Sequence, residues 1–280
     1  EESMEKKWAL ILGASSGFGG ASAIELSKYG YNIFGVHLDR QATMPQVHQI
    51  IKKIEKNGQQ AVYFNINAAD QIKINDTLNE IKERFATSKE HSKVNVLIHS
   101  LAFGTLKPFI SKNPDECVTP AQMTMTLEVM AHSLVYWTQG LVFRNLLAHG
   151  GRIFALTSAG SHTVIPNYGA VSAAKAALEA HIRQLAVELG SMRVTCNAIM
   201  AGVTDTPAGR KIPLFDKMLQ AAQFKNPQGR LTTPEDIAKA IVALCDEKCD
   251  WISGNVIGVD GGEYIVNFIG EKAHLAFKMD

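Results

Sequence analysis

Short apolar runs alternate with longer amphipathic stretches along the chain. The runs with the length and composition of buried strands are residues 8–12, 32–37, 61–65, 94–100, 151–157, 193–200 and 256–259. The stretches with helical spacing are residues 19–29, 43–57, 72–85, 126–149, 170–190, 213–224 and 234–245. Nearly continuous apolar strands separated by helices indicate a parallel sheet that is covered on both faces. The pattern therefore predicts a three-layer α/β fold with a doubly wound parallel sheet of about seven strands.

Two long segments interrupt the alternation. Residues 106–119 are expected to cross the surface. Residues 202–233 contain three prolines and are expected to include one short helix. Loops of this length in a compact domain often cover a binding site, so we expect residues 203–233 to form a substrate lid, with disorder as the alternative. No linker or repeat divides the chain, and a single domain over residues 1–280 is expected.

The composition excludes several classes of protein. The formal net charge is +1 and the basic residues are scattered, which argues against nucleic acid or an anionic membrane as the main partner. The apolar runs are too short to cross a bilayer, and the N-terminal residues lack the apolar core of a signal peptide. The cysteines form no CxxC motif. We therefore expect a cytoplasmic protein with reduced thiols, no metal site and no membrane insertion.

A glycine-rich turn follows the first predicted strand. Residues 13–20 read GASSGFGG and lead into a helix. Glycines let the backbone approach a pyrophosphate, and the N-terminus of the next helix favours its negative charge. Such a turn can be only a turn, but the strand before it and the helix after it are the context of a dinucleotide site. The candidate phosphate-binding residues are Gly13, Ser15, Ser16, Gly17, Phe18 and Gly19.

The end of the second predicted strand should meet the adenosine ribose. His37, Asp39 and Arg40 stand there. A carboxylate at this place binds the ribose hydroxyls of NAD, whereas an arginine pairs with the 2′-phosphate of NADP. Both groups are present; we favour NADPH through Arg40, with NADH as the alternative. The alternative is that Asp39 and Arg40 form only a solvated pair on the surface and do not bind a cofactor.

Further candidates stand at the ends of other predicted strands, where ligands of open α/β sheets bind. Asn65 and Ile66 end the third strand and are expected to bracket the adenine. Small residues follow the fourth strand, and hydroxyl-bearing residues follow the sixth. The candidates at these two strand ends are Ser100, Leu101, Ala102, Gly202, Thr204 and Thr206.

Tyr168 and Lys175 are the two reactive side chains of residues 167–178. The alanine-rich segment between them is expected to be helical from about Gly169. A seven-residue spacing is almost two turns, so the two side chains would share one helix face, about 10 Å apart along the axis if Tyr168 is helical. Taken alone, Tyr168 and Lys175 could be two exposed polar residues that lie on one helix face by chance. Together with the glycine-rich turn, the pair indicates a nucleotide-dependent active site.

With these residues the chain resembles the short-chain dehydrogenase/reductase superfamily along essentially its whole length. The matching pieces are Gly13-x3-Gly17-x-Gly19, Tyr168 with Lys175, residues 197–206 and Val259-Asp260-Gly261-Gly262. The resemblance implies a Rossmann fold, a nicotinamide cofactor and a role for Lys175 in holding the nicotinamide ribose. It also implies a homotetramer in which the long helices over residues 126–149 and 170–190 form an interface.

Within that superfamily, the chain departs from the usual dehydrogenase pattern. Val171 stands where the active-site tyrosine is usual, four residues before the lysine, and it cannot transfer a proton. Met130 replaces the asparagine of the usual proton relay. The Tyr-x6-Lys spacing and the sequence His-Ser-Leu-Ala-Phe over residues 99–103 are similar to the enoyl-acyl-carrier-protein reductase branch. A serine-bearing type of that branch matches Ser158, ten residues before Tyr168.

That branch implies a reaction. A trans-2-enoyl thioester, carried by acyl carrier protein or coenzyme A, would be reduced to the saturated thioester in fatty-acid biosynthesis. Tyr168 would stabilise the negative charge that develops on the thioester oxygen, and the cation of Lys175 would favour it. Ser158 is expected to contact substrate or cofactor, or only to satisfy the strand end. The catalytic candidates are therefore Tyr168, Lys175 and Ser158.

Two other functions stay open on the sequence. A reductase of 3-oxoacyl thioesters or other carbonyl compounds is the second enzyme hypothesis, and Val171 and Met130 count against it. A non-catalytic NADP-sensing protein is the third hypothesis. The retention of Tyr168, Lys175 and the glycine-rich turn counts against this last possibility.

Overall fold

The computed structural model describes residues 6–87 and 92–267, and its sheet is the predicted one. The strands are β1 (Lys7–Leu12), β2 (Asn32–His37), β3 (Ala61–Asn65), β4 (Lys93–His99), β5 (Leu147–Ser158), β6 (Thr195–Ala201) and β7 (Val256–Val259). They pair in parallel in the order β3-β2-β1-β4-β5-β6-β7. The order reverses between β1 and β4, the point at which sheets of this kind bind ligands. The predicted doubly wound parallel sheet is confirmed.

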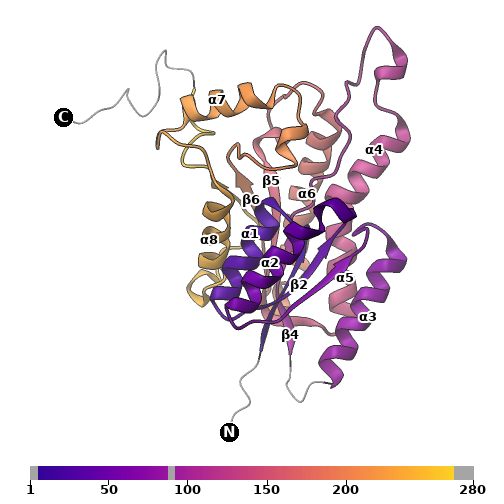
Figure 1. Cartoon of the computed structure of the whole chain (residues 1–280), viewed down its shortest axis with the longest axis vertical. Helices are drawn as coiled ribbons and strands as arrows, with labels where there is room; N and C mark the ends of the chain where they lie inside the picture. The colour runs from indigo at the N-terminus through magenta and orange to yellow at the C-terminus, as the bar shows by residue number, and fades with distance from the viewer. Residues whose placement is uncertain (1–5, 88–91, 268–280) are drawn as a thin grey trace, which may run out of the picture.

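Helices cover both faces of this sheet (Figure 1). On one face lie α1 (Gly17–Lys28), α2 (Met44–Lys56) and α8 (Pro234–Leu244), and on the other lie α3 (Gln71–Thr87), α5 (Ser133–Phe143) and α6 (Gly169–Glu188). Alternate residues of one strand serve both layers. In β1, Leu10 packs in the core that contains Trp137, whereas Ile11 packs in the core that contains Ile54. Burial on both faces is why the strands read as continuous apolar runs.

The helix predicted over residues 126–149 is wrong at both ends. The observed elements are α4 (Pro120–Leu127), a π-helical turn (Glu128–His132) and α5. The helix begins early because Thr119 forms a capping box and a proline occupies the first turn. It ends early because Asn145 adopts a left-handed conformation (φ 55°), after which Leu147 pairs with β4. A short apolar run has the same pattern in a buried strand as in a helix, so periodicity could not locate this end.

Residues 203–233, here named the capping segment, lie beyond the carboxyl ends of the strands. They contain a 3₁₀ turn (Gly209–Lys211) and α7 (Phe215–Lys225), so the expected short helix is confirmed. Figure 1 shows α7 at the opposite end of the molecule from the first described residues. Asn226, directly after α7, donates a hydrogen bond of 2.9 Å to the carbonyl oxygen of Asp260. This bond fastens the base of the capping segment to the turn that follows β7.

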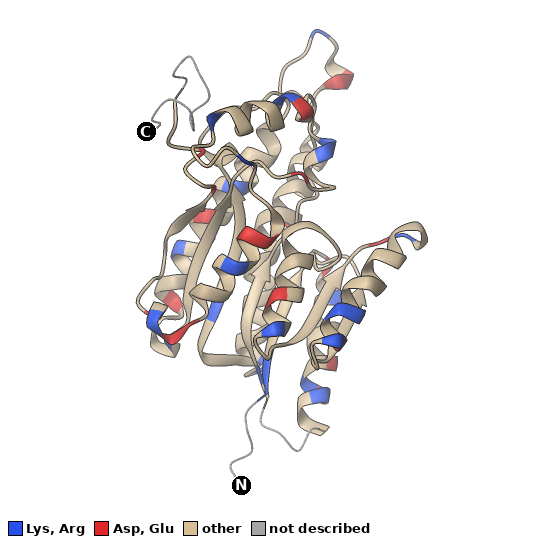
Figure 2. Cartoon of the chain, turned by 60° about the vertical axis from the view of Figure 1, so that its left-hand side comes forward, with Lys and Arg blue, Asp and Glu red and all other residues tan. Residues whose placement is uncertain are grey.

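Charges of both signs are interspersed over the outer helices, and the central sheet carries few of them (Figure 2). All four cysteines are free thiols. Within residues 6–87 and 92–267, no three histidine, cysteine or acidic side chains are grouped as metal ligands would be. No helix in these same ranges is long and apolar enough to cross a bilayer.

Candidate active site

A pocket of about 250 Å³ opens at the carboxyl edge of the sheet, between the strand ends and the capping segment. One wall is apolar and is formed by Phe103, Leu106, Met130, Ile165, Val171, Ile212, Phe215 and Met218. The polar side chains in the lining include Ser158, Tyr168, Lys175, Thr204 and Thr206. A mainly apolar cavity with a few convergent polar groups is the usual form of a small-molecule site.

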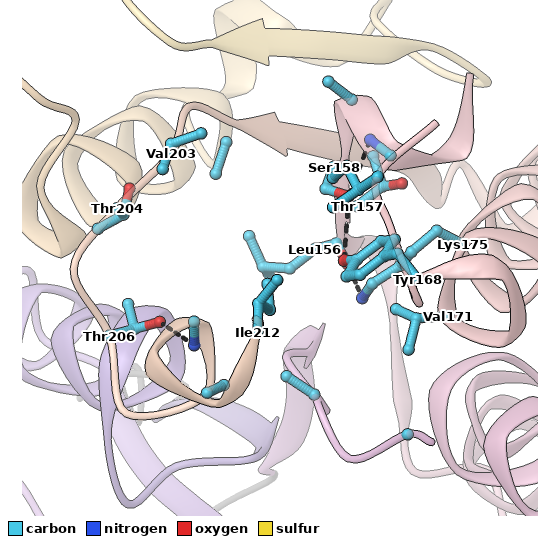
Figure 3. A pocket seen from close by; sticks show the side chains of 18 of the residues that line it. Leu156, Thr157, Ser158, Tyr168, Val171, Lys175, Val203, Thr204, Thr206 and Ile212 are labelled. Carbon is cyan, nitrogen blue, oxygen red and sulfur yellow. Dashed lines mark hydrogen bonds between the residues drawn. The ribbon is translucent and has the colours of Figure 1, made fainter. Parts of the chain in front are cut away.

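Tyr168 lies just before α6 and not within it. It is the N-cap residue, with φ −95° and ψ 1°, so the separation of about 10 Å expected for a helical tyrosine does not apply. The ring is 8% exposed, and its hydroxyl lies 3.4 Å from Ser158 Oγ (Figure 3). Burial raises the pKa of the Tyr168 hydroxyl, and the hydrogen bond with Ser158 opposes this only in part. The phenol therefore keeps its proton at neutral pH and can donate it in a hydrogen bond.

Lys175 is buried on α6 and reaches the same pocket. Its Nζ donates a hydrogen bond of 2.6 Å to the carbonyl oxygen of Leu156 in β5. Burial lowers the pKa of Lys175 to about 8, while the nearby carboxylate of Glu179 acts in the opposite direction. The side chain is thus mostly cationic at neutral pH. Ser158 ends β5 as expected, so the fold brings all three predicted catalytic residues together.

Val171 and Met130 both line the pocket, and they are two positions at which the sequence departs from the usual dehydrogenase pattern. Met130 belongs to the π-helical turn, and both side chains are buried. They pack tightly around Gly104, because a Cβ atom built there would lie 2.8 Å from each of them and from Thr126. Neither side chain carries a transferable proton, so the phenol of Tyr168 faces a wall without an acid.

The glycine-rich turn is packed so closely that two of its positions require glycine. At Gly13, which has φ +88°, an added Cβ would lie 2.3 Å from the carbonyl oxygen of Ser100. At Gly19 it would lie 2.1 Å from the carbonyl oxygen of Gly13. Ser16 caps α1 in an extended conformation and makes no side-chain cap bond, which leaves the first amides of the helix open. This cradle fits the pyrophosphate of a dinucleotide.

Asp39 connects the end of β2 to this cradle. Its carboxylate lies 3.0 Å from His37 Nδ1, and its main chain exchanges two hydrogen bonds with the amide of Asn65. Burial raises the pKa of the Asp39 carboxyl, but hydrogen bonds led by that from Ser15 outweigh burial and hold the pKa below its ordinary value. Ser15 belongs to the glycine-rich turn, so the charged carboxylate stands beside the phosphate site. The Arg40 side chain is exposed.

The remaining predicted cofactor residues, apart from Ile66, either line the pocket or lie next to it. Those that line the pocket are Phe18, Ser100, Leu101, Ala102, Lys175, Gly202, Thr204 and Thr206. Those of the glycine-rich turn lie next to it: a Cβ built at Gly17 would be 3.6 Å from Thr206 Cγ2. Ile66 differs from both sets, because its amide donates to the carbonyl oxygen of His37 while its side chain packs against the core.

Two carboxylates near the pocket were not predicted from the sequence. Glu263 lines the pocket and accepts a hydrogen bond of 3.2 Å from the amide of Val203, 60 residues earlier. No pattern in the sequence joins these two positions. Glu179 stands four residues after Lys175 on α6, and this spacing was a signal that could have identified it.

Comparison with known proteins shows the family to which the chain is related. A family model described as Enoyl-(Acyl carrier protein) reductase matches residues 13–263. Versicolorin reductase 1 of Dothistroma septosporum is 25% identical over 276 residues, which cover 93% of this chain and 97% of that protein. The protein named Enoyl-[acyl-carrier-protein] reductase [NADH] FabI of Rickettsia typhi is 31% identical over 201 residues, covering 72% and 73%.

A solved structure has the same fold as this chain. The enoyl-(acyl-carrier-protein) reductase of Anaplasma phagocytophilum, in complex with NAD, superposes with a TM-score of 0.78 at 22% identity. The superposition covers 95% of this chain and 94% of that one. The Rossmann-like architecture is therefore common to both.

Proposed function

The chain belongs to the enoyl-(acyl carrier protein) reductase family of oxidoreductases, and from that premise we propose that it reduces a trans-2-enoyl thioester to the saturated acyl thioester in fatty-acid biosynthesis. The observation that carries the proposal is the lining of one pocket. Tyr168 and Lys175 face it together, while Val171, between them in sequence, offers only methyl groups. A single phenol donor next to an apolar wall suits a conjugated thioester.

A reduced nicotinamide nucleotide, when bound, supplies the hydride for the β-carbon. The glycine-rich turn would hold its pyrophosphate, and Thr204 and Thr206, which line the pocket, would contact the nicotinamide side. Lys175 would hold the nicotinamide ribose. The close packing at Gly13 and the open start of α1 support this assignment.

We propose NADH as the preferred form of the cofactor, in place of the NADPH expected from Arg40. The Asp39 carboxylate is oriented by His37 and reaches Ser15 of the glycine-rich turn, whereas Arg40 is exposed. A carboxylate there accepts hydrogen bonds from ribose hydroxyls and repels a 2′-phosphate. The enoyl reductase relative from Rickettsia typhi also carries NADH in its name.

The phenol of Tyr168 acts on the thioester oxygen. It is protonated at neutral pH, so it can donate a hydrogen bond as negative charge appears on that oxygen. Ser158, 3.4 Å from the phenol oxygen, can hold the hydroxyl in orientation or take part in the same hydrogen bond. The Lys175 ammonium stabilises the same charge at longer range.

The apolar wall would receive the acyl chain, and the capping segment would close over it as a lid. Lys211, in that segment, lies 5.9 Å from the centre of the Phe103 ring, across the pocket mouth.

We propose acyl carrier protein as the carrier, with coenzyme A as the alternative. A homotetramer is proposed as well: Phe143 on α5 and Val187 on α6 are each 79% exposed, and a second copy would cover such groups.

A two-substrate assay tests the reaction. Purified protein is mixed with NADH or NADPH and with either crotonyl or acetoacetyl thioester, and the absorbance of the reduced cofactor is followed. We expect oxidation with the crotonyl thioester. Oxidation with the acetoacetyl thioester alone would favour a carbonyl reductase. Cofactor binding without oxidation of either mixture would favour a sensing protein.

A further inference from the structure

Glu179 is a buried carboxylate to which the proposed function gives no role. It lies on α6, one helical turn after Lys175, and is only 3% exposed. Its Oε1 accepts a hydrogen bond of 2.6 Å from Thr157 Oγ1. A carboxylate that is removed from water costs free energy unless its surroundings compensate. Its position beside the pocket therefore needs a physical reason.

Consecutive residues of β5 hold Glu179 and Lys175. The carbonyl oxygen of Leu156 accepts the hydrogen bond from Lys175 Nζ, and the hydroxyl of the next residue, Thr157, binds Glu179. One strand end thus fixes the ammonium and the carboxylate relative to each other. Each charge is held by one neutral hydrogen-bonding group of the strand.

His162 lies next to the same carboxylate on the solvent side. Its Nε2 is 3.6 Å from Glu179 Oε2, and its side chain is 56% exposed. Its Nδ1 lies 2.6 Å from Ser161 Oγ, and that hydroxyl donates to the carbonyl oxygen of Ser158. Glu179 therefore has an exposed neighbour in His162 and a buried neighbour in Lys175.

Two other titratable groups near Lys175, His99 and Tyr168, carry no charge at neutral pH. His99, at the end of β4, is fully buried, and burial lowers its pKa to about 3. Tyr168 is a protonated phenol, because burial raises its pKa. Glu179 is the carboxylate one helical turn away on α6, and its negative charge favours the ammonium form of Lys175.

We propose that Glu179 is a positioning residue that acts through Lys175, its negative charge keeping the buried ammonium cationic while the enzyme works. This inference rests on the proposed function, in which the cation stabilises charge on the substrate. Burial places the pKa of Lys175 near 8, so the cation is present below that pH and is lost as the pH rises through it. Removal of the carboxylate charge moves this loss to lower pH.

The expected size of the effect follows from the usual influence of a neighbouring charge on a pKa. A neighbouring opposite charge commonly shifts a pKa by at least one unit. If the pKa of Lys175 falls by about one unit, its cationic fraction at pH 8 falls about fivefold, and the fraction at pH 6 hardly changes. The effect should therefore be visible on the basic side, where the cationic fraction of Lys175 falls as the pH rises.

The test is a titration of Lys175 itself, without cofactor. Protein labelled with ¹³C-lysine is titrated by NMR, and the Lys175 signal is assigned as the one missing from Lys175→Met. We expect a midpoint near pH 8 in the unaltered protein and a lower midpoint in Glu179→Gln, which keeps the shape and the acceptor for Thr157. Glu179→Asp, which keeps the charge, should stay closer to the unaltered protein. An equal midpoint in Glu179→Gln and in the unaltered protein would overturn the proposal.

His162→Ala is the matched control. It removes the exposed neighbour of the same carboxylate and leaves the charge at residue 179 in place, so the midpoint of Lys175 should not fall. A structural role for the network predicts instead that His162→Ala and Glu179→Asp disturb Lys175 as much as Glu179→Gln does. Thermal unfolding of each variant verifies that it is folded.

Kinetics separate this inference from the proposed function. The basic limb of kcat/KM with crotonyl thioester should move to lower pH in Glu179→Gln, in step with the NMR midpoint. If the unaltered protein does not reduce the thioester, the proposed function fails, whatever the NMR result. If it does and neither midpoint nor limb moves in Glu179→Gln, the role of Glu179 fails alone.

Discussion

The phenol of Tyr168 and the ammonium of Lys175 reach one pocket from different backbone positions. The tyrosine leaves the chain at the N-cap of α6, whereas the lysine stands within the helix. Burial acts in opposite senses on the two groups: it raises the pKa of the phenol and lowers that of the ammonium. Both effects disfavour the charged form.

Replacement of Tyr168 by phenylalanine tests the phenol as the donor to the thioester oxygen. Loss of one donor to a developing oxyanion typically lowers kcat by about 10²- to 10³-fold. We expect a loss of that order with little change in the Kd of the cofactor, measured by fluorescence titration. Ser158→Ala removes a longer contact of 3.4 Å and should lower kcat by only about fivefold. Unchanged kcat in Tyr168→Phe would remove this residue from the chemistry.

Asp39 is the residue that should set the choice between NADH and NADPH. Asp39→Ala removes an acceptor for ribose hydroxyls and a negative charge, so the Kd of NADH should rise about tenfold and that of NADPH should not. Arg40→Ala is the companion variant and should leave the preference for NADH intact. Tight NADPH binding that disappears in Arg40→Ala would show that the proposed preference for NADH is wrong.

Among the elements, the glycine-rich turn is the one that the sequence specified most fully. Its strand-turn-helix context and spacing predicted the phosphate cradle, because only glycine tolerates its close contacts. The helix after residue 119 was harder to predict, since a capping box and a π-helical turn decide its course. In the sequence, the capping segment was recognisable only as a long stretch that contains prolines. Its attachment through Asn226 and Glu263 joins residues that are far apart in the sequence, so it was not predicted.

Two glycines give a matched test of the cradle. Gly13 and Gly30 have almost the same left-handed backbone, with φ +88° and +85°. A Cβ at Gly13 would lie 2.3 Å from the carbonyl oxygen of Ser100, whereas a Cβ at Gly30 would meet nothing within 4 Å. Both alanine variants therefore carry backbone strain of about 1 kcal/mol. Only Gly13→Ala should also lose cofactor affinity, by more than tenfold in a fluorescence titration. Equal losses in the two variants would exclude the cradle as their cause.

Over the whole molecule, the parallel sheet gathers the site. Residues that follow β1, β2, β4, β5 and β6 meet at one edge because all strands point the same way, and the reversal of order between β1 and β4 leaves room for a ligand. For this reason the candidates at strand ends could be predicted from the chain alone. Contacts that cross between layers, such as Glu179 with Thr157, depend on the final packing of α6 on the sheet and were not predictable from either segment.

Transfer of deuterium tests the central claim most directly. The protein is incubated with crotonyl thioester and NADH that carries deuterium in the transferable position at C4 of the nicotinamide, and the product is analysed by mass spectrometry and NMR. We expect a butyryl thioester with one deuterium on its β-carbon and a solvent proton on its α-carbon. Crotonyl thioester that stays unlabelled, while acetoacetyl thioester yields a deuterated 3-hydroxybutyryl product, would contradict it.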